Sequence, residues 1–369
     1  MRNITLPFFL KLACILISIV ALGYLSIIGK TVLAPLVFAF LFSIFLLPIA
    51  TFLEKKFHFP RGLAAIVTIL VALVFFAGIV CLFGAQISNL AQEWPAFKKQ
   101  ILDLTHELQG WIRIKFHLNS NQQTNYINNT TPSVLNSGKA ILEKTLISVS
   151  STLLLFIFML IYTFFILLYR RLLMRFIVVA FSQKNIDKIY DIAEQVKFII
   201  RKYITGLFIE TSIMVALSFL IFWILGIPYI FLLALLVGIL NLIPYIGIYV
   251  AIAITCCITF ATSDGQHALY VAIALIILHF IDANITMPKI VGSKVKLNPL
   301  IVILGVVSGG MIWGIAGMFL AIPLIGIAKV IFDRVEGFEA WGILLGDEEE
   351  KPKEMRQLES DLKKKEKNL

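Results

Sequence analysis

Long apolar stretches recur along this chain of 369 residues and constrain its fold more than any other feature. Several reach the roughly 18 to 20 residues that an α-helix needs to cross a hydrocarbon layer of about 30 Å. Hydrophobic residues make up 59% of the chain, against about 45–50% in soluble domains. The sequence therefore predicts an all-α polytopic membrane protein with six to eight transmembrane helices. The apolar segments are 8–28, 32–53, 62–88, 146–169, 205–226, 228–262, 267–288 and 299–332.

Polar segments divide the chain between these stretches. We interpret residues 91–145 as a solvated insert with one or two surface helices, the alternative being a binding module. Residues 170–203 carry eight Lys or Arg against three acids. Cytoplasmic loops collect Lys and Arg, so this segment and both termini are expected in the cytoplasm. The predicted organisation is helices one to three in 1–90, the insert 91–145, helix four in 146–169, the basic segment 170–203, a transport core 204–335 and a charged tail 336–369.

The region 228–262 is too long for one simple span and contains its own break. Pro244 removes a helical hydrogen-bond donor, and Gly247 permits a turn. The two arms would each extend roughly 20 Å, which suits a re-entrant hairpin. No Lys or Arg occurs from Tyr203 to Pro288. With a hairpin here, the next span crosses inward and brings the following lysines to the cytoplasm, as the charge rule requires. Those lysines are Lys289, Lys294 and Lys296.

The last apolar region resembles the same plan in the opposite orientation. Ser308, Gly309 and Gly310 would break 299–332 into a second hairpin, while Pro288 and Gly292 mark the connection before it. Two re-entrant hairpins in an inverted repeat are typical of secondary transporters, whose broken helices hold substrate or ions near the middle of the membrane. A conventional bundle of eight spans is the alternative.

Two acids lie well inside apolar spans of the C-terminal half, Glu210 and Asp282. Charged groups are costly in the bilayer, so both are candidates for a substrate or ion pathway. In the hairpin topology both lie at a similar depth, whereas eight simple spans would place them near opposite faces. His279 shares a helical face with Asp282 and could relay protons or form a structural pair. Asn241 and Asn284 could bind solute, or cap helices and bond between them.

Several kinds of chemistry have no support in the sequence. No catalytic or nucleotide-binding motif occurs, so we expect neither an enzyme nor direct coupling to ATP. The four cysteines have no CxxC spacing, and we expect no metal site and no cofactor beyond H⁺ or Na⁺ as a coupling ion. The net charge of +10 comes from membrane flanks, which excludes nucleic acid as a partner and leaves the lipid bilayer.

Four motifs resemble the autoinducer-2 exporter family of bacterial permeases. They are the segment from Asn241 to Gly247, the block from Asp282 through Gly292, Asn298-Pro299-Leu300, and the stretch from Gly314 to Leu324. The resemblance covers nearly the whole chain, although Ile248 stands where many relatives have proline. It implies export of the quorum-sensing signal autoinducer-2 or, as in some relatives, Na⁺/H⁺ antiport. It also implies a homo-oligomer, with pentamers suggested, in the bacterial inner membrane.

The leading hypothesis is therefore a secondary transporter that exports a small polar organic solute, with autoinducer-2 as one candidate. The alternatives are a Na⁺(K⁺)/H⁺ antiporter that uses the same acids, and a membrane scaffold without transport activity. Residues Pro244, Gly247, Ser308, Gly309 and Gly310 would form the gating tips.

Overall fold

The computed structural model describes residues 7–92, 155–181, 186–286 and 297–347. In these ranges the chain is helical apart from turns and one antiparallel bridge between Leu297 and Gly346. Six of the described helices are long and apolar enough to cross a membrane. The prediction of an all-α polytopic membrane protein is therefore confirmed. The six are Lys30–Lys56, Arg61–Gln86, Leu155–Ala180, Ile186–Ile224, Gly265–Thr286 and Ile315–Phe332.

The N-terminal helices α1 (Phe8–Ile28), α2 (Lys30–Lys56) and α3 (Arg61–Gln92) follow one another through short turns. Along α1 and α3 many large aliphatic and aromatic side chains are exposed, and Arg61 is an exposed charge at the start of α3. A soluble monomer rarely presents so much contiguous apolar surface. Acyl chains, by contrast, are as apolar as these side chains. The exposed surface of these helices therefore suits contact with lipid.

The described chain forms two compact units. One comprises Met1–Ile69, Phe158–Ile209 and Thr286–Leu369, and the other comprises Leu70–Ile157 and Glu210–Ile285. The four boundaries in sequence fall within the helices α3, Leu155–Ala180, α6 (Ile186–Ile224) and Gly265–Thr286.

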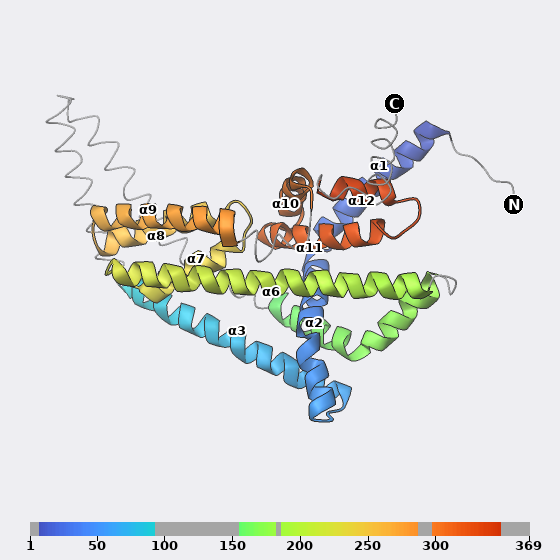
Figure 1. Ribbon diagram of the computed structural model, residues 1–369, viewed down its shortest axis with the longest axis horizontal. Coiled ribbons are helices and arrows are strands. Elements are labelled where there is room, and N and C mark those ends of the chain that lie inside the picture. Colours follow the sequence, from blue (N-terminus) through green and yellow to red (C-terminus); the bar gives the residue numbers. More distant parts are fainter. Residues whose placement is uncertain (1–6, 93–154, 182–185, 287–296, 348–369) are drawn as a thin grey trace, which may run out of the picture. The chain divides into compact units, whose positions relative to one another are not determined.

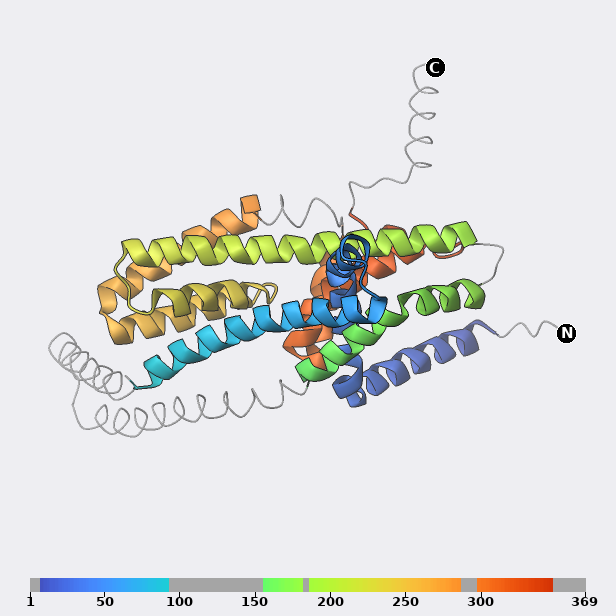
Figure 2. The same ribbon diagram turned by 90° about the horizontal axis from the view of Figure 1, so that it is seen from below.

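The second unit contains the C-terminal part of α6 (Ile186–Ile224) with α7 (Ile230–Asn241), α8 (Gly247–Thr262) and α9 (Gly265–Ile281). Figures 1 and 2 show α7, α8 and α9 side by side along this part of α6. Their shared core is aliphatic and aromatic, and it includes side chains that are fully buried, such as Phe222, Leu233 and Val271. A Cβ on Gly238 would come within 2.3 Å of the Val215 side chain, so α7 lies very close to α6.

The first hairpin is present where the sequence predicts it. α7 ends at Asn241, residues 242–246 form a turn, and α8 begins at Gly247. Tyr245 adopts φ 64°, and a Cβ on Gly247 would meet the Leu240 carbonyl at 1.7 Å. The arms of 12 and 16 residues measure about 18 and 24 Å, short of a bilayer core of about 30 Å. Their lengths suit a hairpin that enters and leaves the membrane on one side.

A second hairpin lies in the first unit, but its break is not where the sequence analysis placed it. α10 (Pro299–Trp313) runs through Ser308, Gly309 and Gly310 as unbroken helix. The turn is at Gly314, whose φ of 64° and ψ of −140° favour glycine, and α11 (Ile315–Phe332) follows directly. The prediction of a break at 308–310 was therefore wrong.

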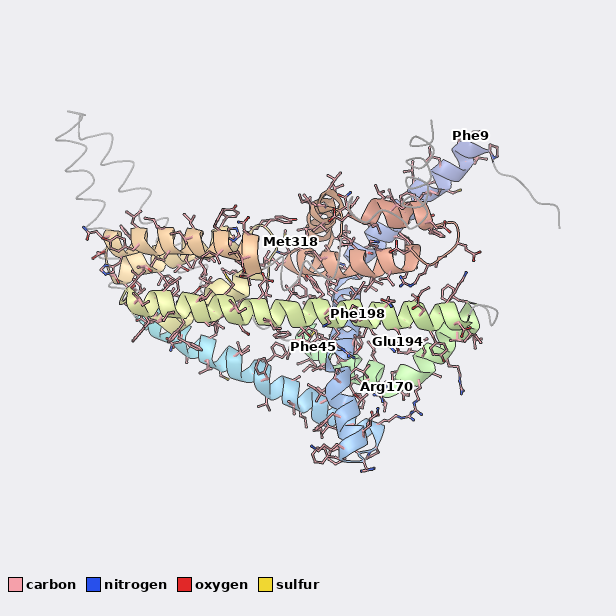
Figure 3. All side chains as sticks on the ribbon, in the orientation of Figure 1. Phe9, Phe45, Arg170, Glu194, Phe198 and Met318 are labelled. Carbon is pink, nitrogen blue, oxygen red and sulfur yellow. The ribbon has the colours of Figure 1, made fainter. Side chains whose placement is uncertain are left out.

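Close packing explains the glycines that were assigned to that break. A Cβ on Gly309 would meet the Gly317 carbonyl at 2.4 Å, so the backbones of α10 and α11 touch at this point. Met318, marked in Figure 3, places its methyl carbon over Gly310. These residues bring two helices together, as small residues do in membrane proteins. They do not end a helix.

The basic segment 170–203 is helical over residues 170–180 and 186–203. Residues 170–180 extend the helix Leu155–Ala180, and α6 starts at Ile186. α6 has 39 residues, or about 58 Å, nearly twice the hydrocarbon thickness. Its basic N-terminal half is therefore an extension beyond the apolar span. In the first unit, ion pairs of Lys188 with Glu336 and of Asp191 with Arg334 join this extension to the turn before α12 (Glu339–Leu345).

Candidate functional site

Three polar side chains meet within the second unit, each from a different helix. Glu210 lies on α6, Asn241 is the last residue of α7, and Asp282 directly follows α9. The Asn241 amide nitrogen donates to Glu210 Oε1 at 3.3 Å and to Asp282 Oδ2 at 3.4 Å. We call these residues the acid–amide cluster. Their meeting favours the hairpin topology over eight simple spans, which would separate the two acids.

Local sequence explains why each side chain reaches this place. Asn241 stands at the C-terminal end of α7 because the turn that contains Pro244 cannot continue the helix. Gly238, one turn earlier, lets α7 approach α6 closely enough for the Asn241 amide to reach Glu210. Asp282 begins a π-helical turn that runs to Thr286. Such turns are rare in proteins overall, and those that do occur are often found at functional sites.

The cluster is buried and has unsatisfied hydrogen-bonding capacity. Only 6% of Glu210 and 4% of Asp282 is exposed. The second oxygen of each carboxyl group, Glu210 Oε2 and Asp282 Oδ1, is buried and has no hydrogen-bond partner among the described residues. Since an asparagine amide has two hydrogens, Asn241 can donate one to each acid and no more. The two remaining oxygens can bind a proton, coordinate a cation or accept a hydrogen bond from a solute.

No Lys or Arg from this part of the chain can neutralise the cluster. From Tyr203 to Pro288 the sequence contains neither Lys nor Arg. In the described residues, neither Glu210 nor Asp282 forms an ion pair. Two buried carboxylates without a counter-ion are strongly unfavourable. The arrangement is therefore suited to binding protons or a cation from outside the chain.

His279 and Asn284 do not join the cluster by hydrogen bonds. The His279 ring packs edge-on against Tyr249 with centroids 6.1 Å apart, and its buried Nδ1 has no partner in the described part of the chain. Asn284 donates to the Phe280 carbonyl of its own helix and is exposed. A proton relay through His279 stays a prediction. The Asn284 bond lies within one helix, so it is neither the cap nor the bond between helices that was its alternative role, and solute binding by Asn284 stays a prediction.

The structure places the residues that were predicted to form hairpin breaks in different settings. Pro244 and Gly247 lie in or directly after the α7–α8 turn, beside the cluster. Ser308, Gly309 and Gly310 lie inside α10. Pro288 and Gly292 lie outside the described residues. The gating role of these positions stays a prediction.

Side chains suited to metal binding do not gather in the described ranges. No group of three or more His, Cys, Asp or Glu there could hold a metal ion. All four cysteines are free, and Cys256 donates weakly to the Ala268 carbonyl. Three further polar residues of this unit, Ser218, Thr255 and Thr259, are fully buried and were not predicted as site residues. Because hydroxyl residues are common in membrane helices, nothing in the sequence marked these three as unusual.

Comparison with known proteins gives one family. The profile described as "AI-2E family transporter" matches residues 15–337. A relative from Bacillus subtilis (strain 168), named "Putative transport protein YrrI", is 26% identical over 316 residues, covering 82% of this chain and 86% of its own. The Escherichia coli (strain K12) protein named "AI-2 transport protein TqsA" is 24% identical over 343 residues, covering 89% of this chain and 95% of its own.

Proposed function

Because the chain belongs to the AI-2E family of transporters, we propose that it is a secondary transporter that exports a small polar organic solute across the bacterial inner membrane. The coarser assignment, a multi-pass membrane permease, follows from the family and from six apolar helices of spanning length. A transporter family also supports a non-enzymatic function. The autoinducer-2 named in one relative, at 24% identity, makes that molecule the first solute to test.

The acid–amide cluster is the observation that carries the proposal. It joins a spanning helix, the end of a broken hairpin arm and a π-helical turn through buried polar atoms. Buried acids in membrane helices are costly and mark pathways for substrates, ions or protons. Broken helices in secondary transporters bind their ligands at such places. We assign Glu210 and Asp282 to ion coupling or solute binding, and Asn241 to holding the two carboxyl groups together.

A Na⁺(K⁺)/H⁺ antiporter is the second candidate, and the lack of a counter-ion favours it. No Lys or Arg lies between Tyr203 and Pro288 to neutralise Glu210 and Asp282. His279, one helical turn before Asp282, is the nearest basic side chain of this stretch. An alkali cation or a proton from solution can supply the remaining positive charge. Such an antiporter would move protons when a cation gradient is imposed, without any organic solute.

The wider setting of the protein is part of the proposal. We assign both termini to the cytoplasm, because Lys and Arg gather in cytoplasmic segments, and we expect a homo-oligomer, with a pentamer as the form that the family resemblance implies. The lipid bilayer is the expected environment and H⁺ or Na⁺ the expected coupling ion. No nucleic-acid partner or further cofactor is proposed.

Solute uptake into proteoliposomes tests the export proposal, with the protein inserted so that its cytoplasmic side faces the outer solution. Wild-type protein should accumulate autoinducer-2 when a proton or Na⁺ gradient is imposed, while Asp282→Asn and Glu210→Gln should each lose most of the uptake. Glu194→Gln is the matched control, because Glu194 is an exposed acid on the same helix as Glu210. Full uptake by both cluster variants would remove the acids from the pathway. No uptake by folded wild-type protein would point to a different solute or to the antiporter.

A further inference from the structure

Buried polar atoms without hydrogen-bond partners are concentrated in the second unit. Across the described residues there are seven such side-chain atoms, and six of them lie between Glu210 and Asp282. Three belong to the acid–amide cluster and His279, and the other three are the hydroxyl oxygens of Ser218, Thr255 and Thr259. Native proteins satisfy almost all buried polar atoms, so a group of exceptions needs a physical cause.

These three hydroxyls differ from other buried hydroxyls of the same chain. Thr68 donates to the Ala64 carbonyl at 2.7 Å, and Thr163 donates to the Met159 carbonyl at 2.7 Å. This bond to the preceding turn is the usual way in which a helical hydroxyl is satisfied. Ser218, Thr255 and Thr259 have 0% exposure and do not make it. Their hydroxyl groups are therefore available to another partner inside the unit.

The three hydroxyls lie at defined depths on one side of the acid–amide cluster. α6 and α8 run in the same direction, since α7 is antiparallel to both, and Glu210 and Gly247 lie near the same level. Ser218 and Thr255 each follow these residues by eight positions along the helix, which is about 12 Å. Thr259 lies about 6 Å further, toward the turn between α8 and α9. Their neighbours Met214, Phe222 and Ala251 belong to one core.

We propose that Ser218, Thr255 and Thr259 hold a file of water molecules that carries protons between the α8–α9 turn and the acid–amide cluster. A hydroxyl group both donates and accepts hydrogen bonds, so it can orient water in either direction of transfer. Buried water binds where polar groups are otherwise unsatisfied. Each water accepts one proton and releases another, and the last proton converts a carboxylate of Glu210 or Asp282 into a carboxyl group.

Water suits this line of residues better than a bound alkali cation. Three neutral hydroxyls spread over different depths cannot together replace the several oxygen ligands of a dehydrated ion. Since the gap of about 12 Å between the cluster and the first hydroxyls is too long for direct proton transfer, the proposed file includes water molecules in this gap. The proposal rests on the proposed function in one respect: the protons delivered to the cluster are those that drive transport.

Silver-ion accessibility tests the water file without any transport measurement. In full-length protein with Cys14, Cys81, Cys256 and Cys257 replaced by alanine, cysteine is introduced singly by Ser218→Cys, Thr255→Cys and Thr259→Cys. Membrane vesicles are treated with Ag⁺, and the remaining thiols are counted with N-ethylmaleimide after denaturation. Val271→Cys and Leu275→Cys are the controls, because both positions have 0% exposure and lie in the aliphatic core of the same unit.

Thiols on the water file should react at least about tenfold faster than the controls, a difference of about 1.4 kcal/mol in barrier height. Equal, slow reaction at all five positions would overturn the proposal. This readout is independent of the proposed function. If the three thiols react rapidly but Asp282→Asn transports normally, the water file stands and the role of the acids fails.

A second pair of variants keeps the proposal testable if the cysteine variants do not fold. Thr255→Val removes the hydroxyl at nearly constant volume, and Thr68→Val does the same at a buried threonine that bonds within its own helix. Proton flux in proteoliposomes should fall several-fold in Thr255→Val and stay near the wild-type value in Thr68→Val. An equal flux in both variants would contradict the water file.

Discussion

Asn241 has two amide hydrogens, and the structure directs them to two different carboxyl groups. One bond reaches Glu210 and the other reaches Asp282, so one residue at a helix end links three helices. Hydrogen bonds to charged groups contribute about 1.5–3 kcal/mol each, and the loss is largest when the acceptor stays buried. At the scale of single residues, Asn241 therefore contributes most to holding the cluster together.

Asn241→Leu should destabilise the folded protein, because both carboxyl groups lose their donor while remaining buried. We expect a loss of about 1.5–3 kcal/mol, measured as a lower midpoint of thermal unfolding in detergent. Asn284→Leu is the control, since Asn284 is exposed and bonds only within its own helix in the described structure. An equal decrease in both variants would show that Asn241 has no special role.

Asp264 gives a pH dependence outside the membrane-spanning helices. Its side chain accepts from the His267 backbone N–H at 2.7 Å, and this bond, with the His267 side chain, lowers the pKa of Asp264. A folded-state pKa below the unfolded one stabilises the protein above the unfolded pKa. That contribution is lost as the pH falls through the folded value. Its loss should therefore begin near pH 4, where unfolded aspartate titrates, and continue below it.

The comparison with Asp264→Asn isolates this charge, because asparagine can still cap α9. The wild type should have the higher unfolding midpoint at neutral pH, and the difference should vanish in acid. A difference that stays constant down to pH 3 would contradict the assignment.

At the residue scale the sequence identified the two acids that the structure brings together, but it missed what surrounds them. Glu210 and Asp282 could be found because charged residues are rare in apolar segments. The bridging role of Asn241 could not, since it depends on Gly238 bringing α7 close to α6. The hydroxyls of Ser218 and Thr255 were missed because only the structure shows that they lack the usual bond to their own helix.

At the scale of helices, the two hairpins differ in how their arms are joined. The α7–α8 hairpin has a turn of several residues with Pro244 in it, whereas α10 and α11 meet at Gly314 alone. Proline removes a donor and so predicts a break from sequence. Glycine permits both turns and close packing. The position of the second break was therefore ambiguous, and Gly309 was assigned to a turn when it makes a helix contact.

Adding a methyl group at the closest helix contact should disrupt the α10–α11 hairpin. A Cβ on Gly317 would lie 1.9 Å from the Gly309 carbonyl, so Gly317→Ala forces the two backbones apart. We expect a large loss of thermal stability in detergent, together with loss of transport. Gly78→Ala is the matched control, since a Cβ there meets nothing within 4 Å, and it should be neutral or stabilising by about 0.5–1 kcal/mol. Equal behaviour of the two variants would refute the close contact.

The length of α6 was also beyond the sequence analysis. Its N-terminal half carries Lys197, Arg201 and Lys202, and charges of this density were interpreted as a separate basic segment. The structure shows one continuous helix in which Val196, Ile200 and Tyr203 are buried in the core of the first unit. The apolar face was present in the sequence, but the high charge of the opposite face obscured it.

At the scale of the whole molecule, the hairpins decide which side of the membrane each turn faces. With the α7–α8 hairpin re-entrant and the basic segment in the cytoplasm, as proposed, the α8–α9 turn would lie outside the cell. In a bundle of eight simple spans with the same orientation, that turn would lie in the cytoplasm. The meeting of Glu210 with Asp282 through Asn241 favours the first arrangement.

Cysteine labelling in intact cells distinguishes the two topologies. In a background without native cysteines, Gln266→Cys, at an exposed position beside the α8–α9 turn, should react with a membrane-impermeant maleimide from outside. Glu194→Cys, on the basic extension of α6, should react only after the membrane is permeabilised. Protection of position 266 until permeabilisation would support eight simple spans.

The central claim is that Asp282, as part of the acid–amide cluster, couples protons to transport. Proteoliposomes loaded with a pH-sensitive dye test it directly, with Na⁺, K⁺ or autoinducer-2 gradients imposed in turn on wild type and Asp282→Asn. We predict that at least one gradient drives proton flux in the wild type and that the flux is lost in Asp282→Asn, while both proteins unfold at similar temperatures. Equal proton flux in wild type and Asp282→Asn would contradict the account.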